Sequence, residues 1–468
     1  DKKLSCSSSD TWLQVDNNSA GKTTIDNRTY WVLPAGSYYL AGDITLDKSI
    51  LIESGEVNIC LNGHKLRLNH GTVQIWEVIQ LNGGTLNLTD CQDKGTVCHV
   101  DGNPGRGVTV ENGTSFTLYG GTICNNEAYA SNSTTAQGGG VYIGSSSTFN
   151  MYGGKIHNNW ATVGSNGTES NRWGYGGGVY CAPNGTFNLL AGEITENQVR
   201  VDSNNGGAGM GGGVFNKGTF TMSGDSKISK NFIASNSSMK QYGGGVCNCD
   251  SPAKFVMNGG EISGNYINSW YSSPACGGGV YNNSKFEFTG GTITGNRLEA
   301  ASVNVFGGGV YNDQSGNFTM SSGIISNNTT KTNGASGGGG VCIYRSTFTM
   351  NSGEISGNQA LTYTASASPN ACDGGGIYFD SGTIGNFTLS GGTITGNTTK
   401  GKGAGICIYS DASQKNFHLS GNPVVWDNTT DGKQSNLYMD QSYDLKSPLT
   451  KGAKVGLSLK WVNKDNVM

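Results

Sequence analysis

One short unit recurs along most of this chain and constrains its fold more than any other feature of the sequence. The unit is a Gly-Gly-Gly-Val-Tyr segment, then a Phe-x-Met or Phe-x-Leu segment, then a Gly-Gly-x-Ile-x-x-Asn segment. Each segment is short, apolar and bounded by turn residues, which is typical of a strand rather than a helix. About nine units follow one another. We therefore expect an all-β parallel β-helix, a solenoid with three strands per turn that buries its apolar residues by stacking.

Three landmarks align the units. The glycine triplets begin at Gly138, Gly176, Gly211, Gly243, Gly277, Gly307, Gly338 and Gly374, with a degenerate last copy at Gly403. The aromatic residues of the second segment are Phe149, Phe187, Phe220, Phe255, Phe286, Phe318, Phe348, Phe387 and Phe417. The asparagines that end the unit are Asn159, Asn197, Asn231, Asn265, Asn296, Asn328, Asn358 and Asn397.

Side chains alternate along a strand, so the two faces of the first segment can be assigned. If Val points inward, the residue after Tyr also points inward, and in four consecutive units it is Asn216, Asn248, Asn282 and Asn312. Amides stacked about 4.8 Å apart can hydrogen-bond along the stack, so we interpret these asparagines as structural. We interpret the asparagines after Ile as turn residues that tolerate a left-handed backbone.

The outward slot between Val and Asn is usually aromatic, and its members are Tyr142, Tyr180, Phe215, Tyr281, Tyr311 and Tyr378. Two interpretations stay open: an external stripe that stacks on sugar rings, or a layer that shields the sheet beneath adjoining loops. Cys247, Cys342 and Cys407 occupy the same slot. This placement favours thiols that replace aromatic side chains in a stack, so we expect most of the 12 cysteines to be free.

Length varies mainly between each terminal Asn and the next glycine triplet. Segments 160–175, 198–210, 266–276 and 359–373 are the long ones. Because each leaves the solenoid at the same corner, we expect stacked loops on one edge, a common place for the binding face of a repeat protein. Trp160, Trp173 and Trp270 lie in these loops. They are candidates for stacking on a sugar or for packing within the loops.

We divide the chain into entry and capping strands over residues 1–75, a catalytic β-helix over 76–435 and C-terminal capping strands over 436–468. The net charge of −3 and the 13% of charged residues do not favour nucleic acid or an anionic membrane as a partner. The sequence contains no run of 18 apolar residues, so no segment is expected to insert into a membrane. The five histidines form no ligand motif, so no metal or other cofactor is expected. The polar start at Asp1 and the polar composition favour a mature or trimmed protein that is secreted or displayed at the cell surface.

Acidic residues are rare on the first segment of the unit, and the exceptions define a candidate site. Asp313 and Asp380 both lie four residues after a glycine triplet, on the outward face, and Tyr344 holds the same slot in the unit between them. The two aspartates are therefore expected two rungs apart, about 10 Å in a regular stack. Asp373 ends the 359–373 loop immediately before Gly374, where it can reach the same face.

Paired carboxylates are what glycoside hydrolysis requires. One of them, protonated, releases the leaving group, and the other, ionised, attacks the sugar or activates water. A straight strand would hold Asp373 and Asp380 about 23 Å apart, so they can cooperate only if the glycines fold the chain back. A purely structural role stays open, because Asp before Gly is common in turns. The expected substrate-binding residues are Asp313, Tyr344, Tyr378, Trp173 and Trp270.

The stretch Asp-Gly-Gly-Gly-Ile-Tyr-Phe-Asp at 373–380, late in a series of GGGVY repeats, resembles glycoside hydrolase family 136, the lacto-N-biosidases of gut bacteria. The resemblance implies a right-handed parallel β-helix, with Asp373 as acid/base and Asp380 as nucleophile of a retaining double displacement. It implies release of lacto-N-biose (Galβ1-3GlcNAc) from lacto-N-tetraose-type milk oligosaccharides or host glycans. Family members depend on a helical folding partner, and this sequence contains no helical domain. A separate partner subunit or a trimmed chain is therefore expected.

GGGVY-like repeats also occur in bacterial surface β-helix proteins without enzymatic activity. The alternative is therefore an adhesin that binds host glycans or protein through the loops. A polysaccharide lyase is disfavoured, because such sites combine acids that bind Ca²⁺ with a Lys or Arg base.

Overall fold

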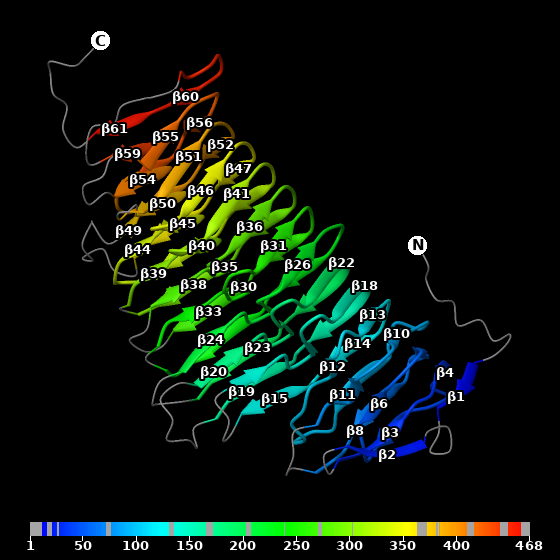
Figure 1. Cartoon of the computed structure of the whole chain (residues 1–468). Helices are drawn as coiled ribbons and strands as arrows, with labels where there is room; N and C mark the ends of the chain where they lie inside the picture. Colours follow the sequence, from blue (N-terminus) through cyan, green and yellow to red (C-terminus); the bar gives the residue numbers. More distant parts are fainter. Residues whose placement is uncertain are drawn as a thin grey trace, which may run out of the picture. The chain divides into compact units, whose positions relative to one another are not determined.

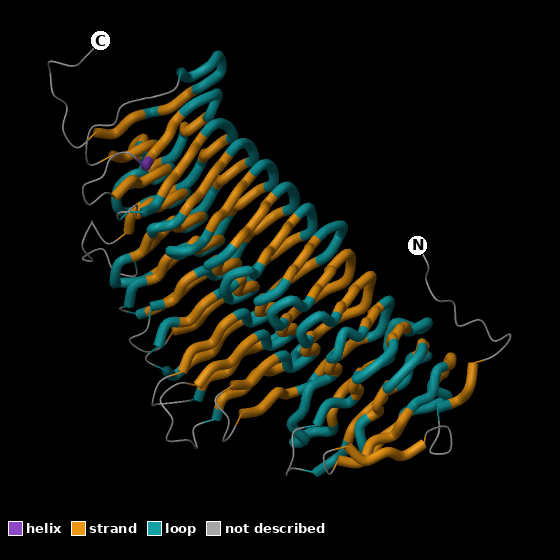
Figure 2. Tube along the Cα trace, in the orientation of Figure 1, coloured by secondary structure: helices purple, strands orange, loops and turns teal. Residues whose placement is uncertain are grey.

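The structure is a computed structural model of the whole chain. It describes residues 12–15, 21–25, 28–71, 76–130, 135–164, 172–202, 207–237, 239–269, 274–301, 303–362, 372–380, 382, 384–409, 416–439 and 448–459. Over these ranges the protein is built from β-strands, and its one helical residue, Asn416, is 3₁₀ rather than α (Figures 1 and 2). The described part accordingly offers no helix with the length and apolar character needed to span a membrane.

The chain forms two compact units. Unit 1 comprises residues 1–237 and 252–255, and unit 2 comprises residues 238–251 and 256–468. Each unit contains strands of four sheets, which we name A to D. Sheet A contains the Phe and Ile segments of the repeat, sheet B the Val-Tyr segment, sheet C the residues after the terminal Asn, and sheet D the residues before the glycine triplet.

Unit 1 contains the strands drawn from blue to green in Figure 1. Sheet B is formed by β2 (Gly21–Ile25), β3 (Arg28–Val32), β6 (Ile50–Ile52), β9 (Ile79–Leu81), β12 (Val108–Val110), β17 (Val141–Ile143), β21 (Val179–Cys181) and β25 (Val214–Asn216). Sheet C is formed by β15 (Glu127–Ala130), β19 (Trp160–Val163), β23 (Gln198–Val201) and β28 (Phe232–Ser235), and sheet D by β16 (Thr135–Gln137), β20 (Arg172–Tyr175) and β24 (Gly207–Met210). Sheet A is formed by β1 (Trp12–Gln14), β4 (Gly36–Tyr39), β5 (Ile44–Leu46), β7 (Glu56–Cys60), β8 (Lys65–Leu68), β10 (Thr85–Thr89), β11 (Thr96–His99), β13 (Ser115–Leu118), β14 (Thr122–Cys124), β18 (Thr148–His157), β22 (Thr186–Thr195), β26 (Thr219–Met222) and β27 (Lys227–Ser229).

Unit 2 repeats the same plan. Sheet B is formed by β30 (Val246–Asn248), β35 (Val280–Asn282), β40 (Val310–Asn312), β45 (Val341–Tyr344), β50 (Ile377–Asp380), β54 (Ile406–Tyr409), β59 (Leu437–Met439) and β61 (Leu457–Leu459). Sheet C is formed by β33 (Tyr266–Ser269), β38 (Arg297–Ala300), β43 (Thr329–Lys331), β48 (Gln359–Leu361), β53 (Thr398–Thr399), β57 (Thr429–Thr430) and β58 (Lys433–Gln434), and sheet D by β29 (Gln241–Tyr242), β34 (Ala275–Cys276), β39 (Val305–Phe306), β44 (Ser336–Gly337) and β49 (Cys372–Asp373). Sheet A is formed by β32 (Glu261–Ser263), β36 (Lys285–Phe288), β37 (Thr292–Thr294), β41 (Asn317–Met320), β42 (Ile324–Ser326), β46 (Thr347–Met350), β47 (Glu354–Ser356), β51 (Asn386–Leu389), β52 (Thr393–Thr395), β55 (Phe417–Leu419), β56 (Val424–Trp426) and β60 (Lys454–Val455), while β31 (Lys254–Met257) contains the division between the units.

The predicted parallel β-solenoid is confirmed in both units, because equivalent strands of successive turns pair in parallel and in register. The prediction of three strands per turn is wrong. One turn of unit 2 runs through β34, β35, β36, β37 and β38, which are five strands. The segments interpreted as loops begin and end with strands: segment 160–175 begins with β19 and ends with β20. Strands such as Gly-Ala-Gly-Met in β24 carry few residues with a high β-propensity, so their composition does not reveal them.

The core of each unit is a set of stacked apolar columns. In unit 1 the Phe116, Phe149, Phe187 and Phe220 rings follow one another at centroid distances of 4.7, 5.0 and 4.9 Å. In unit 2 the Phe286, Phe318, Phe348 and Phe387 rings do the same at 4.7, 4.7 and 5.3 Å. All of these side chains are fully buried. Each stabilises its turn by about 1.5–3 kcal/mol through burial alone.

A ladder of buried asparagines closes the turn after the Ile segment. Asn328 Nδ2 donates to Asn358 Oδ1 at 3.0 Å and to the Ile293 carbonyl at 2.9 Å, and its Oδ1 accepts from Asn296. The interpretation of these asparagines as left-handed turn residues is wrong by one position. The residue with positive φ is the preceding one, for example Asn158 at 53° and Asn327 at 55°. The second set behaves as expected, because Asn248 donates to Asn282 at 2.7 Å and Asn282 to Asn312 at 2.6 Å.

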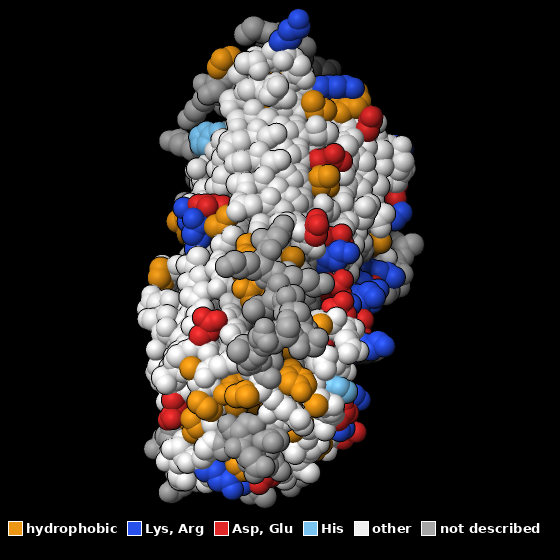
Figure 3. Space-filling view, turned by 90° about the vertical axis from the view of Figure 1, so that its right-hand side faces the viewer, with side chains coloured by type: hydrophobic (Ala, Val, Ile, Leu, Met, Phe, Trp, Pro, Cys, Tyr) orange, Lys and Arg blue, Asp and Glu red, His pale blue; other side chains and the backbone are white. Residues whose placement is uncertain are grey.

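The stacking of β4, β7 and β10 already runs through the predicted entry segment, while the domain boundaries themselves stay a prediction. Most of the described cysteines are free, as expected. The interpretation of Cys247 as a free thiol in the stack is wrong, because Cys247 forms a disulfide with Cys249, and Cys60 is disulfide-bonded as well. On the face in Figure 3, most of the described surface is neither charged nor hydrophobic.

Candidate functional site

The glycine triplets turn the chain from sheet D into sheet B. In unit 2, Gly374, Gly375 and Gly376 join β49 to β50. Gly374 has a φ of +68°, and a Cβ on it would overlap the carbonyl oxygen of Ile377. The same overlap, with the carbonyl three residues ahead, recurs at the first glycine of the triplets in earlier turns of this unit. The backbone therefore requires glycine here, and we call this turn the glycine corner.

Across the glycine corner, one column of sheet D faces the outward side chains of sheet B. The Tyr242 ring lies 4.6 Å from the Tyr281 ring, and the Phe306 ring lies 5.9 Å from the Tyr378 ring. A Cβ on Gly337 would lie 2.8 Å from the Tyr378 ring. By register, the column consists of Tyr242, Cys276, Phe306, Gly337 and Asp373. In earlier turns, residues at this position of sheet D face sheet B. The Asp373 backbone occupies the same position, and its side chain lies outside the described part of the structure.

Asp380 lies half-buried at the end of β50. It pairs in register with Tyr344 of β45 on one side and with Tyr409 of β54 on the other. Its Oδ1 accepts a hydrogen bond from the Gly382 N–H at 3.2 Å. The Arg345 guanidinium lies 5.0 Å from the centre of the Tyr344 ring. The carboxylate-bearing position is therefore flanked along the sheet by two aromatic residues.

Asp313 belongs to the same outward column. It follows Asn312, which pairs with Ile343, so it holds the strand position that Tyr344 and Asp380 hold on the next two strands. Its Oδ2 accepts a hydrogen bond from the Tyr281 phenol at 2.5 Å, and its Oδ1 accepts one from the Gln314 N–H at 2.9 Å. The register prediction for this pair is confirmed: Asp313 and Asp380 lie two strands apart, with Tyr344 between them.

A buried layer of phenols and thiols adjoins these carboxylates. Burial raises the pKa of the Cys342 thiol well above its usual value, and the nearby Cys276, Asp380 and Asp313 raise it further. Burial, with the Asp313 charge, also raises the pKa of Cys276 to about 12. Burial raises the pKa of the Tyr281 phenol, and the Asp313 charge adds to this effect. These groups are neutral near pH 7, so Asp313 and Asp380 both adjoin an uncharged, poorly hydrated layer.

The outward aromatic slot is mostly buried rather than exposed. Phe215 is 1% exposed, and Tyr281 and Tyr311 are 4% and 5% exposed. The rings stack along sheet B and pack against residues of sheet D, as when Tyr175 lies 4.5 Å from Phe215. The shielding interpretation therefore holds for these residues. Tyr378 is the predicted sugar contact in this slot, and it remains half-buried.

Of the two predicted tryptophan contacts, the structure describes one, and it belongs to the other unit. Trp173 lies in unit 1 on β20, half-buried and stacked on Tyr175 at 6.3 Å. Trp270 lies outside the described residues. The residues that the structure gathers on one face of sheet B in unit 2 are Asp313, Tyr344, Tyr378 and Asp380, with the Asp373 backbone in the facing column.

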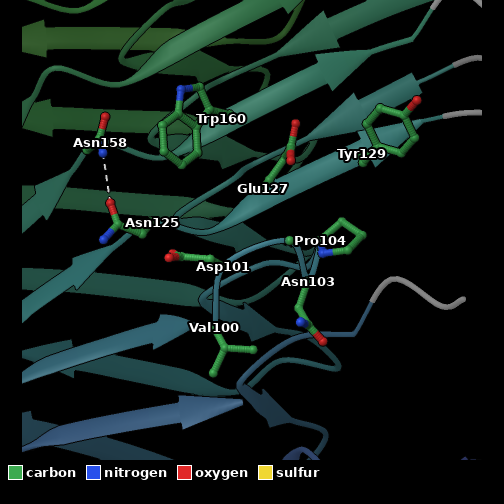
Figure 4. Close-up of a pocket in the computed structure, with 10 residues that line it drawn as sticks. Val100, Asp101, Asn103, Pro104, Asn125, Glu127, Tyr129, Asn158 and Trp160 are labelled. Carbon is green, nitrogen blue, oxygen red and sulfur yellow. Dashed lines mark hydrogen bonds between the residues drawn. The ribbon is translucent and has the colours of Figure 1, made fainter. Parts of the chain in front are cut away.

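A second candidate site, in unit 1, was not predicted as a whole. A groove there is lined by Asp101, Glu127, Tyr129 and Trp160 among other residues (Figure 4). Of these, only Trp160 was a candidate from the sequence. The alignment of Asn126-Glu127 with Asn159-Trp160 could have revealed that Glu127 and Trp160 are neighbours. Nothing in the sequence indicates that the turn carrying Asp101 packs beside them.

The described residues contain no group of three or more His, Cys, Asp or Glu side chains placed to hold a metal ion. Neither site therefore provides a metal centre from the described side chains. A comparison of the chain with known protein families, with curated proteins and with solved structures finds no match.

Proposed function

We propose that the chain is a retaining glycoside hydrolase whose active site lies at the glycine corner of unit 2. In this proposal Asp380 is the nucleophile and Asp373 the general acid/base. Tyr344, Tyr378 and Asp313 contact the sugar. By its resemblance to family 136, the substrate is a lacto-N-tetraose-type oligosaccharide or host glycan, and the released product is lacto-N-biose.

The reaction follows from the two carboxylates. The protonated acid gives its proton to the glycosidic oxygen of the leaving group while Asp380 attacks the anomeric carbon and forms a glycosyl ester. Water then attacks that carbon as the first carboxylate takes back a proton, and the ester bond breaks. Two inversions at one carbon give net retention. This chemistry requires the two carboxyl groups to approach to about 5–5.5 Å.

One observation carries the proposal: the glycine corner places the strand of Asp373 opposite the outward face that bears Asp380. The two residues are seven positions apart in sequence, yet they belong to sheets D and B, whose side chains meet across the corner at Phe306 and Tyr378. The aromatic neighbours Tyr344 and Tyr378 suit the apolar faces of sugar rings.

The test is hydrolysis of lacto-N-tetraose by wild-type protein and by Asp373→Asn and Asp380→Asn, with lacto-N-biose as the measured product. Each substitution should lower kcat at least about 10³-fold, because it removes one of two groups that act together. Glu354→Gln, at a half-buried position on the outward face of sheet A, is the matched control and should retain wild-type activity. Both aspartate variants should unfold at the wild-type temperature. Undiminished turnover in either of them would exclude the assigned pair.

The alternative is an adhesin that binds host glycans through its surface without hydrolysing them. The groove of unit 1 favours it, because an aromatic and acidic groove can bind a sugar without any chemistry. Saturable binding of lacto-N-tetraose with no product from wild-type protein supports the adhesin and contradicts the hydrolase. In either case we propose an extracellular location. For the hydrolase, we also propose a separate helical folding partner.

A further inference from the structure

The groove of unit 1 has the size of a ligand site. Its volume is about 620 Å³, within the range of about 300–1,000 Å³ that small-molecule sites occupy. Its side chains approach from three directions (Figure 4). They come from two neighbouring strands of sheet C, from the turns that precede those strands, and from the turn at residues 100–104.

The floor of the groove is formed by the first two strands of sheet C. Along β15, Ala128 and Ala130 are buried while Glu127 and Tyr129 alternate with them and are half-buried. Trp160 of β19 pairs in register with Glu127 and is also half-buried. Side chains directly opposite each other on parallel strands stand about 5 Å apart. The Trp160 ring and the Glu127 carboxylate therefore lie side by side on the floor.

The wall of the groove is the turn at residues 100–104, which is held in place at its C-terminal end. Gly105 bridges the start of β15: its N–H donates to the Glu127 carbonyl at 2.7 Å and its carbonyl accepts from Glu127 at 2.8 Å. The His70 N–H donates to Asn103 Oδ1 at 3.1 Å, and His70 Nε2 lies 2.9 Å from the Pro104 carbonyl. Asp101 is thereby fixed beside the floor.

Two amides close the remaining side. Asn125 and Asn158 have φ values of 56° and 53°, so each stands at the corner before the ladder asparagine. Asn158 Nδ2 donates to Asn125 Oδ1 at 2.7 Å. That bond engages the Nδ2 of Asn158 and the Oδ1 of Asn125. The Nδ2 of Asn125 and the Oδ1 of Asn158 can form hydrogen bonds with a ligand hydroxyl.

We propose that this groove binds a neutral saccharide, independently of the chemistry proposed for unit 2. The indole face of Trp160 suits the apolar C–H face of a pyranose. Carboxylate oxygens of Asp101 and Glu127 accept hydrogen bonds from sugar hydroxyls, and charge-assisted bonds of this kind are strong. Among the described residues that line the groove none is Lys or Arg, so an anionic ligand would be repelled. With only two acids among these described lining residues, a sugar fits the lining better than a divalent cation, which prefers six or more oxygens.

Calorimetric titration tests the proposal, using the Asp380→Asn chain so that no probe is consumed. The probes are lacto-N-tetraose, cellotetraose and maltotetraose, each titrated alone, and calcium chloride titrated separately. At least one saccharide should bind with a stoichiometry of at least one, and Trp160→Ala should weaken that binding about five- to tenfold. Glu127→Gln should also weaken binding of the same saccharide, because it removes a charged hydrogen-bond acceptor.

Two further variants separate binding from folding. Trp160→Phe keeps an aromatic face and should bind within about twofold of the parent. Tyr152→Ala removes an aromatic residue that is 51% exposed on sheet A and should bind as the parent does. The proposal is overturned if none of the three saccharides binds, if Trp160→Ala binds as tightly as the parent, or if calcium binds at Glu127 and no saccharide does. These outcomes can be interpreted even if unit 2 hydrolyses no glycan, because the titrations measure binding and not turnover.

Discussion

The Tyr281 phenol donates a 2.5 Å hydrogen bond to Oδ2 of Asp313, and this contact ties the first acidic residue of the outward column to the aromatic layer beneath it. Tyr281 is 4% exposed. Tyr281→Phe keeps the ring and removes the donor. The free energy of unfolding should fall by about 1.5–3 kcal/mol, the usual contribution of a hydrogen bond to a charged group. Urea unfolding followed by circular dichroism measures this loss.

A double-mutant cycle with Asp313→Asn isolates the contact. If Tyr281 and Asp313 stabilise each other, Tyr281→Phe should cost clearly less in the Asp313→Asn background than in the wild type. Equal costs in both backgrounds would show that the phenol stabilises the layer through something other than Asp313.

Gly374→Ala should damage the glycine corner far more than its backbone conformation alone predicts. Gly374 and Gly432 both have positive φ, 68° and 75°, but a Cβ overlaps the Ile377 carbonyl only at Gly374 and meets nothing within 4 Å at Gly432. Gly432→Ala should cost about 1–2 kcal/mol, the strain of a left-handed residue. Gly374→Ala should cost several kcal/mol more or displace β49 from β50. Thermal unfolding of the two variants side by side measures the difference, and equal midpoints would argue against the overlap.

Asn328→Ala tests the buried ladder. The substitution removes the Asn328 donor from the Ile293 carbonyl, and it removes the Oδ1 acceptor of the Asn296 backbone N–H inside the core. The cost is about 1–3 kcal/mol for each unsatisfied group. Asn351→Ala is the matched control, because Asn351 is exposed and should cost under about 0.5 kcal/mol. Hydrogen exchange is the better measurement, since repeat proteins open locally. Faster exchange in β42 and β47 is expected for Asn328→Ala alone.

Unit 1 should lose stability in mild acid because of His99. Its side chain is 3% exposed, with Nδ1 2.8 Å from Asn126 Oδ1 and Nε2 2.9 Å from the Trp76 carbonyl. Burial lowers the pKa of His99 from 6.5 to about 4, and the two hydrogen bonds oppose that shift only partly. Between these values the unfolded chain binds a proton that the folded chain does not. The free energy of unfolding should therefore fall as the pH decreases from about 6.5 to 4, by up to about 3 kcal/mol.

His99→Gln removes this titration. Urea unfolding at about pH 7 and pH 4.5 should show a smaller pH-dependent loss for His99→Gln than for the wild type. An identical loss in both proteins would assign the acid sensitivity to other groups.

The solenoid could be predicted because its structural requirements recur in the sequence of every repeat. The residues of the buried Phe and Ile columns must be apolar, and the first residue of the corner must be glycine. Sheets C and D could not be predicted, because their strands are two to four residues long and contain segments such as Ser336–Gly337. Their pairing comes from the neighbouring turns, and their own composition does not mark them.

The strand register of the candidate site could be predicted from the sequence, but the burial of its side chains could not. The position of Asp313, Tyr344 and Asp380 along sheet B follows from counting residues after each triplet. The burial of the tyrosines does not follow from that counting, because it depends on Tyr242, Cys276 and Phe306 of sheet D. The unit 1 groove was missed for a similar reason: Asp101 lies beside β15 because of a turn that no position in the repeat indicates.

If Asp373 and Asp380 act as an acid/base and nucleophile pair, the anomeric form of the first product is fixed by their mechanism. Proton NMR of lacto-N-tetraose hydrolysis, recorded before mutarotation equilibrates the product, gives that form. Retention requires a covalent intermediate on Asp380, so lacto-N-biose should first appear with the anomeric configuration of the bond that was cleaved, and Asp380→Asn should release none. Product of inverted configuration, or no product from the folded wild-type chain, would exclude Asp373 and Asp380 as the catalytic pair of a retaining hydrolase.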